Sequence, residues 1–280
     1  MAAEKYYAVI DGAIEYRLFF ILENFNPPAV CLYDESLPPE RLKVAPYLVE
    51  VTEKVGLYLE EWQTCWGICL HSKADMKTLR QHLRKYLQVL LPEQEKPVFF
   101  RFYDPRNIWE FLSVLSDWEI HCFMGPIDKI ATNYQGNIQG HDFLANREQY
   151  PRDASSKRKL LSITPEQLEK IETAFAERYV QTLAALIIEW ETIEEFDYVG
   201  YIRGLLTELK NIGITDDHSV RGILKLFFLR RYSSIKESPT RCKRILNKIC
   251  EPGHIRAEEL LLQELGDSSI PWFHFKDKLF

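Results

Sequence analysis

The residues of this chain best suited to acid–base chemistry are Asp11, His71 and Asp104, with Arg106 close to the last of them. Each follows a segment with the composition of a β-strand, and open α/β sheets bind ligands beyond the carboxyl ends of their strands. In a hydrolase, such carboxylates or an imidazole would move a proton. No nucleophile stands at a recognised spacing from them. We therefore expect structural roles: Asp11 in an Asp-Gly-Ala turn, Asp104 as a helix cap, Arg106 in the first turn of that helix and His71 at a strand exit.

The sequence lacks motifs for cofactors and metals. Gly12 stands alone after the first strand pattern, without the glycine spacing of a dinucleotide- or phosphate-binding loop. The histidines lack the paired spacing of zinc sites. His121 and Cys122 are adjacent on an expected strand, so their side chains would point to opposite faces and would not act together as base and nucleophile. We predict no cofactor, no metal site and no catalytic residue.

An arginine lies among aromatic residues in the run Phe99-Phe100-Arg101-Phe102-Tyr103-Asp104-Pro105-Arg106. The composition of residues 97–103 predicts a strand buried on both faces, after which Asp104 and Pro105 would open a helix. Arg101 keeps its proton in proteins, so in such a strand it needs a carboxylate or several carbonyl groups. Asp104, Asp11 and Glu50 are the candidate partners. We expect a structural ion pair.

The first half of the chain has the alternating patterns of an α/β fold. Strands between helices favour parallel crossovers, whereas residues 29–33 and 47–51 have no helix between them and could pair antiparallel. The predicted sheet is therefore mixed. Strands are expected at 6–11, 29–33, 47–51, 66–71 and 98–103, with one or two more in 127–134, and helices at 13–23, 54–63, after Asp75 and around 108–115.

Periodicity fades between about residues 128 and 160, so we place a lobe boundary near residue 155. Beyond it, Thr164 and Gln167 are typical of a helix N-terminus with a capping box. The predicted fold is an α/β amino-terminal lobe with a mixed sheet over 1–155 and an all-α carboxy-terminal lobe over 156–280. The later helices are expected at 196–211, from the Asp216/Asp217 cap to Arg231, and at about 240–250 and 255–265.

Two features of the helical lobe could bind a partner. A basic run with few carboxylates is either a solvated helix face or a docking surface for an acidic protein, and the apolar residues 223–229 within it favour packing into a core over an arm along nucleic acid. The aromatic tail around Trp272 and Phe273 must be covered, either by this lobe or by a partner. Candidate partner-binding residues are Arg230, Arg231, Arg241, Arg244, Trp272 and Phe273.

Composition indicates a folded, soluble protein. Its 35 basic and 41 acidic residues give a net charge of −6, which does not favour nucleic acid or a membrane surface as partner. The start lacks the pattern of a signal peptide, and no apolar run approaches membrane length. The six cysteines lack Cys-x-x-Cys pairs, which suits reduced thiols. We expect a cytoplasmic protein without membrane insertion.

Several segments occur in an order that resembles the adaptor, or chaperone, family of bacterial type VI secretion. They are residues 7–13, 46–51, 66–67, 79–85, 99–106 and 123–127. The similarity spans roughly residues 6 to 127, and 99–106 is its most specific part, with Asp11, Arg101, Asp104, Pro105 and Arg106 as its structural residues. Ala45 departs from the glycine that the family often has before the proline, and the rest of the chain is similar only as a helical partner lobe.

The resemblance implies a non-enzymatic adaptor that binds a secreted effector protein and assists its loading onto a valine-glycine-repeat spike protein. Two alternatives come from other classes. One is a hydrolase-like α/β enzyme that uses Asp11, His71 or Asp104 beside a helical cap. The other is a nucleic-acid-binding regulator that uses the basic helices.

Overall fold

The computed structural model describes residues 5–33, 36–62, 64–134, 136–151, 154, 160–191 and 193–265. The chain divides into two compact units, unit 1 over residues 1–172 and unit 2 over residues 173–279. The predicted boundary at residue 155 lies outside the described residues. Unit 1 is an α/β unit with strands of both orientations and unit 2 is all-helical, which confirms the predicted fold class.

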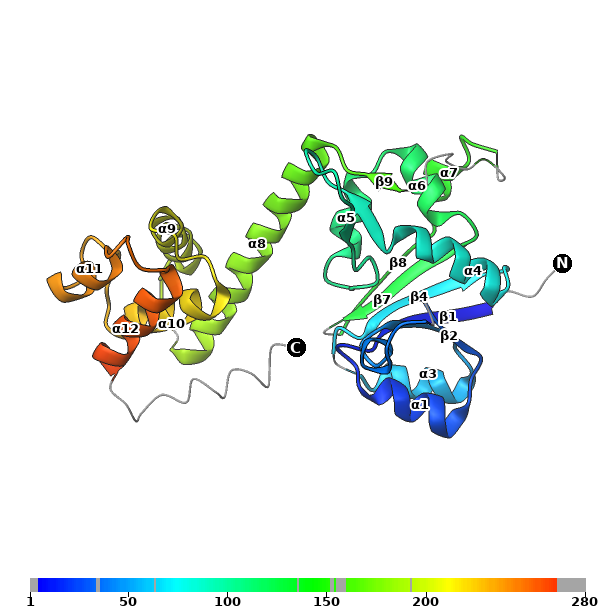
Figure 1. The fold of residues 1–280 in the computed structure, drawn as a ribbon, viewed down its shortest axis with the longest axis horizontal. Helices are drawn as coiled ribbons and strands as arrows, with labels where there is room; N and C mark the ends of the chain where they lie inside the picture. The colour runs from blue at the N-terminus through cyan, green and yellow to red at the C-terminus, as the bar shows by residue number, and fades with distance from the viewer. Residues whose placement is uncertain are drawn as a thin grey trace. The chain divides into compact units, whose positions relative to one another are not determined.

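The larger sheet of unit 1 has six strands among the described residues, in the order β2-β3-β1-β4-β7-β8 (Figure 1). All of its neighbouring strands pair antiparallel, including β2 with β3, for which the sequence left both orientations open. The parallel crossovers that the intervening helices favoured do not occur in this sheet. Its strands are β1 (Lys5–Asp11), β2 (Ala29–Cys31), β3 (Pro46–Glu50), β4 (Gly67–Ser72), β7 (Lys129–Tyr134) and β8 (Asn137–His141).

Different helices cover the two faces of this sheet (Figure 1). Side chains alternate along β1, so that Tyr7 and Val9 enter one core while Ala8 and Ile10 enter the other. The first core is closed by α4 (Met76–Leu83), the 3-10 turn η1 (Arg84–Tyr86), α5 (Ile108–Val114) and α6 (Asp117–Met124). The second is closed by α1 (Arg17–Phe25) and α3 (Glu53–Glu60). The first helix begins at Arg17 instead of residue 13 because the chain forms a turn after Asp11.

A smaller sheet holds the strand of the aromatic run. Among the described residues its order is β6-β5-β9, with β5 (Gln88–Leu90) antiparallel to β6 (Val98–Phe99) and parallel to β9 (Leu161–Ser162). The prediction of a doubly buried strand over 97–103 is wrong. The strand ends at Phe99, whose side chain is 49 % exposed, and turns follow because the backbone N–H of Asp104 donates to Arg101 and its carbonyl accepts from Asn107.

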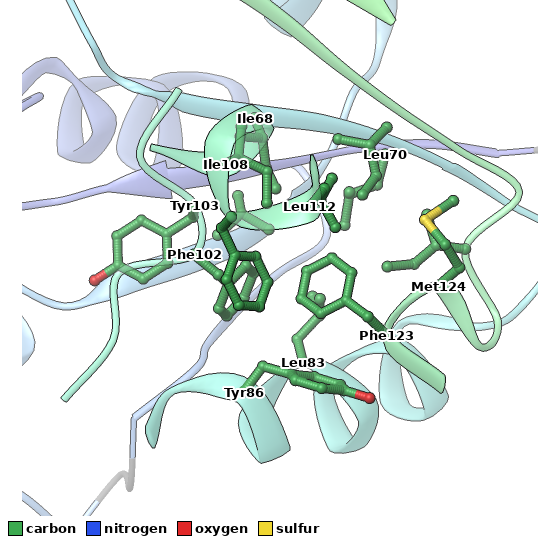
Figure 2. Packing of buried hydrophobic residues seen from close by; sticks show 14 of the residues in the cluster. Ile68, Leu70, Leu83, Tyr86, Phe102, Tyr103, Ile108, Leu112, Phe123 and Met124 are labelled. Atoms are coloured by element: carbon green, nitrogen blue, oxygen red, sulfur yellow. The ribbon is translucent and has the colours of Figure 1, made fainter. Parts of the chain in front are cut away.

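Three other aromatic residues of the run, Phe100, Phe102 and Tyr103, pack in or against the first core. The ring of Phe102 lies 5.9 Å from that of Phe123, which in turn lies 4.7 Å from Tyr86, and Figure 2 shows these rings packed among leucine and isoleucine side chains. His121 and Cys122 lie in α6 rather than on a strand, so the strand argument about their directions is wrong. A capping box of Ser116 and Glu119 starts this helix, a strong signal that the sequence contains.

Helix α8 (Pro165–Trp190) contributes to the cores of both units. Its first residues, Leu168 and Ile171, pack against the first core of unit 1, whereas Val180 and Leu183 lie in the core of unit 2. The predicted capping box is present: the Thr164 hydroxyl accepts from the Gln167 backbone at 3.2 Å, and the Gln167 side chain accepts from the Thr164 backbone at 2.9 Å. None of the described helices combines the length and the apolar character needed to cross a membrane.

Unit 2 packs its helices around one apolar core. Asp197 and Asp216 cap α9 and α10 by accepting backbone N–H groups at 2.8 and 2.9 Å, as expected for N-cap aspartates. The core draws on every one of these helices, with Leu205, Phe227 and Leu260 among its buried members. The helices are α9 (Tyr198–Asn211), α10 (Asp217–Leu229), α11 (Thr240–Leu246) and α12 (Gly253–Leu265). Two short helices, α2 (Pro39–Leu42) and α7 (Leu144–Arg147), belong to unit 1.

A buried arginine joins two helix ends in this core. Arg256 of α12 is 2 % exposed, and its guanidinium donates to the carbonyl oxygens of Leu246, at the end of α11, and Ile212, which follows α9. The last carbonyls of a helix have no partner within the helix and carry partial negative charge. Arg256 therefore satisfies carbonyl groups at two helix ends at once.

Candidate functional site

Asp11 ends β1 in a fully hydrogen-bonded turn. Its backbone N–H donates to Trp66 at 2.8 Å, and its carboxylate accepts from the backbone N–H of Ala13 at 2.9 Å. Gly12 follows because the chain passes close to the segment before β3: a Cβ at this position would lie 2.6 Å from the carbonyl oxygen of Ala45. The Asp-Gly pair is thus explained by the local backbone.

Arg101 forms the expected ion pair, and its partner is Asp11. The Asp11 side chain is 3 % exposed, whereas that of Arg101 is 36 % exposed, so the arginine reaches inward from the surface to a buried carboxylate. Burial raises the pKa of Asp11 above its ordinary value, and Arg101 offsets only part of that effect. The Nε of Arg101 is buried and has no hydrogen-bond partner among the described residues. The pair is an incompletely satisfied structural contact.

Asp104 and Arg106 form a second pair within one turn. The carboxylate accepts from the guanidinium, Nε to Oδ1 at 3.0 Å and to Oδ2 at 3.3 Å and Nη2 to Oδ2 at 2.8 Å, and from the backbone N–H of Arg106 at 2.9 Å. The hydrogen bonds that Arg106 donates to Asp104 are the main cause that raises the pKa of Arg106. The predicted role of Asp104 as a helix cap is wrong, because α5 begins at Ile108 after the turn that Asp104 stabilises. Pro105 and Arg106 accordingly precede the helix.

A third pair of the same form lies beside the first and was not predicted. The buried carboxylate of Glu15 accepts from Arg17 at 2.7 and 2.6 Å and from the hydroxyl of Thr64 at 2.7 Å. Burial acts to raise the pKa of Glu15, but these hydrogen bonds outweigh it and lower the pKa below its ordinary value. The sequence contains a signal for this pair, because Glu15 and Arg17 have the same two-residue spacing as Asp104 and Arg106.

The structure brings Asp104 close to Asp11 but places His71 away from both. The register pairs Tyr6 with His71 and Ile10 with Gly67, so His71 lies beside the beginning of β1 while Asp11 lies at its end. At about 3.4 Å per residue, five residues of strand separate the two positions by roughly 17 Å. The reason is that β1 and β4 are antiparallel, so the carboxyl end of each strand lies beside the amino end of the other. Cys65 lies close to Asp104 and Arg106, and burial raises the pKa of its thiol, which opposes a thiolate nucleophile at that position.

The four predicted binding arginines lie in unit 2 and mostly contact other residues of that unit. Arg231 pairs with Glu191 at 2.5 Å, the guanidinium of Arg230 donates to the carbonyl oxygen of Glu264 at 3.3 Å, and Arg241 donates to the side chain of Gln263 at 2.9 Å. Arg244 is exposed. One of the four is therefore neutralised by a carboxylate that is distant in sequence, and two others contact uncharged oxygen atoms. Trp272 and Phe273 lie outside the described residues.

An open groove of about 700 Å³ lies in unit 1, next to the Asp11–Arg101 pair. Tyr33 connects the two features, because it lines the groove and forms a side-chain hydrogen bond with Tyr103, whose pKa is raised by burial and by Asp11. Sequence analysis missed this groove. The sequence feature that could have indicated an exposed apolar surface is Leu37, an apolar residue in a loop-like segment between Ser36 and two prolines. The lining residues are Leu32, Tyr33, Leu37, Arg41, Arg84, Leu87, Gln88 and Phe99.

Comparison with known proteins gives a match that covers part of unit 1. Neither the curated proteins nor the solved structures contain a match to this chain. Residues 6–122, which carry Asp11, Arg101, Asp104 and Arg106 together with the lining of the groove, match a family described as a domain of unknown function (DUF4123).

Proposed function

We propose that the chain is a non-enzymatic adaptor that binds a secreted effector protein and assists its loading onto a valine-glycine-repeat spike protein. The observation that carries the proposal is the state of the polar residues around the end of β1. Each of the carboxylates of Asp11, Glu15 and Asp104 accepts hydrogen bonds from an arginine and from a backbone N–H. Carboxylates held by such hydrogen bonds fix a loop in place and are poorly suited to attack a substrate.

The order of motifs in residues 6–127 supports the type VI secretion context, because it resembles that of secretion adaptors. The family match over residues 6–122 covers nearly the same segment. Two units with separate cores suit an adaptor that contacts more than one protein. We assign choice of effector to unit 2 and its exposed arginines, and the mechanism is binding alone, which stabilises the bound effector by mass action.

Affinity purification of the tagged chain from its native bacterium, followed by mass spectrometry, tests the adaptor function. We expect a secreted protein, a spike protein or both to be enriched over an untagged control. If cells with active secretion yield neither, the adaptor proposal is wrong.

Charge reversal tests the assignment to unit 2. The variant with Arg230, Arg231, Arg241 and Arg244 all changed to glutamate should lose the effector, as should Arg244→Glu to a smaller extent. Arg244→Glu is the cleaner variant, because the other three arginines also make contacts within unit 2. Lys54→Glu, at an exposed position of unit 1, is the matched control. Unchanged binding in both unit 2 variants would remove these arginines from the site.

A further inference from the structure

The groove of unit 1 is built from segments that are distant in sequence. One wall comes from Leu32, Tyr33 and Leu37 and from α2, and the other from η1, β5 and β6. Arg80 of α4 holds the first wall by donating to the carbonyl oxygens of Cys31 at 2.8 Å and Tyr33 at 3.3 Å. The rings of Tyr33 and Phe99 meet edge to face with centroids 5.4 Å apart, which joins the two walls. The groove is therefore a formed feature of the fold.

Apolar side chains face solvent in this groove. Leu37 and Phe99 are 37 % and 49 % exposed, and Leu32 and Leu87 lie buried beneath the same surface. Exposed apolar side chains gathered around a concavity favour a ligand that covers them. Because the groove is open to solvent, it suits a segment of chain that keeps one face in water better than it suits an enclosed small molecule.

Among the residues that the structure describes, the charged members of the lining have one sign. They are Arg41, which is exposed on α2, and Arg84, which is half-buried on η1. Arginine is suited to bind carboxylates through its planar set of donors. A nucleic acid would require basic residues that follow a phosphate backbone, whereas much of this lining is leucine and aromatic. The chemistry therefore matches a peptide that carries both apolar and acidic side chains.

We propose that this groove is a docking site for a short segment of a partner protein in which leucine-like or aromatic side chains lie beside carboxylates. The apolar side chains of the segment would cover Leu37 and Phe99, and a carboxylate would meet Arg41 at the rim. The proposal goes beyond the adaptor function, since it assigns a second binding surface on unit 1, and it is argued from the groove alone.

Fluorescence anisotropy on the full chain tests the chemistry directly. The probe is a short fluorescein-labelled peptide in which leucine and phenylalanine alternate with glutamate, and its matched partner has lysine in place of every glutamate. We expect the acidic peptide to bind with an affinity that falls as salt is raised, and the lysine peptide to bind on the order of tenfold more weakly.

Two variants place the binding in the groove. Arg41→Glu should weaken the acidic peptide by on the order of tenfold and improve the lysine peptide, because it reverses the sign of the rim charge. Leu37→Ser should weaken both peptides. Matched controls are Lys54→Glu and Leu57→Ser, at exposed positions of α3 in the same unit, and both should bind like the unmodified chain. Equal thermal midpoints for all variants confirm that they fold.

The outcomes separate this proposal from the adaptor function. Absence of peptide binding, or binding that responds to Arg244→Glu but not to Arg41→Glu, would overturn the groove proposal whatever the chain purifies with. If the peptides bind as expected but no secreted or spike protein is found with the chain in bacteria, the groove proposal stands and the adaptor proposal falls.

Discussion

At the scale of residues, the arginine–carboxylate contacts of unit 1 are of two kinds. Glu15–Arg17 and Asp104–Arg106 are local: each carboxylate also accepts the backbone N–H of its arginine, at 3.1 and 2.9 Å. Asp11–Arg101 instead joins residues far apart in sequence and fixes the loop after β6 to the end of β1. The local pairs shape turns, whereas the distant pair fixes tertiary structure.

Replacement of Arg101 tests the architectural role of the distant pair. Arg101→Met should lower the free energy of unfolding by about 3 kcal/mol, because it leaves a buried carboxylate without its compensating charge. Urea denaturation at neutral pH measures this loss.

The double variant Asp11→Asn/Arg101→Met controls for the side chain lost at position 101. It should lose less stability than Arg101→Met, since a neutral amide still accepts from Ala13 and carries no charge to desolvate. An equal loss in the two variants would show that the buried charge is not the cause.

His82 should make the stability of unit 1 depend on pH. It is mostly buried under α6, with a ring nitrogen 2.6 Å from the carbonyl oxygen of Phe123, and burial lowers its pKa from 6.5 to about 4. As the pH falls below about 6.5, the unfolded chain takes up a proton that the folded chain does not bind until about pH 4. The stabilising effect of the neutral ring is thus complete above pH 6.5 and declines toward pH 4.

His82→Gln removes this titration and keeps a donor for the carbonyl of Phe123. Between pH 7 and pH 4, the unmodified chain should lose about 3 kcal/mol more than His82→Gln does in urea denaturation at each pH, given about 1.4 kcal/mol per pKa unit. Parallel pH profiles for the two proteins would contradict this prediction.

At the scale of elements, unit 2 depends on contacts that join helix ends. The N-termini of α9 and α10 are capped by aspartates from the adjacent sequence, whereas the C-terminal ends of α9 and α11 share the guanidinium of Arg256, contributed by α12. Gly213 has a left-handed φ of +74° just after Ile212, which suits its role in ending α9. The three helices are therefore coupled through one side chain.

Arg256→Met should destabilise unit 2 by about 3 kcal/mol, because two buried carbonyl groups lose their donors while the packing volume stays similar. Chemical denaturation followed by circular dichroism at 222 nm measures the loss. Arg244→Met is the matched control at an exposed position of the same unit and should change stability by less than about 0.5 kcal/mol. A similar effect of the two changes would show that the contacts of Arg256 add little.

At the scale of the whole molecule, the apolar cores of the two units are separate from each other. The two cores of unit 1 lie on the two faces of its larger sheet, and the described residues that form the core of unit 2 all come from α8 and the chain after it. Separate cores allow separate cooperative transitions, even though α8 supplies residues to both units.

Calorimetry of the full chain should therefore resolve two unfolding transitions. Arg101→Met should lower the midpoint of one and Arg256→Met that of the other, each by more than about 5 °C and with little change in the unaffected transition. A single transition that both variants shift equally would show that the units unfold as one.

The sequence alone was sufficient for features that depend on near neighbours. Asp75, Thr164 and Asp216 cap helices where the local pattern placed them, because a cap contacts a backbone N–H only two or three residues away. The alternating and helical periods located most strands and helices, since burial of one face imposes those periods. The requirement of Arg101 for a counter-charge also followed from the sequence, because a guanidinium stays protonated whatever its position.

Tertiary structure alone decided which distant groups meet. Strand order and orientation are properties of the whole sheet, so no local pattern showed that His71 and Asp11 lie at opposite edges, that Asp11 rather than Glu50 pairs with Arg101, or that Glu191 neutralises Arg231. Strand β6 ends at Phe99 instead of the predicted residue 103, which leaves Phe99 at the wall of the groove, and this too depends on contacts with distant parts of the chain. Hydrogen bonds and packing partners separated by tens of residues set these positions, and they exist only once the chain has folded.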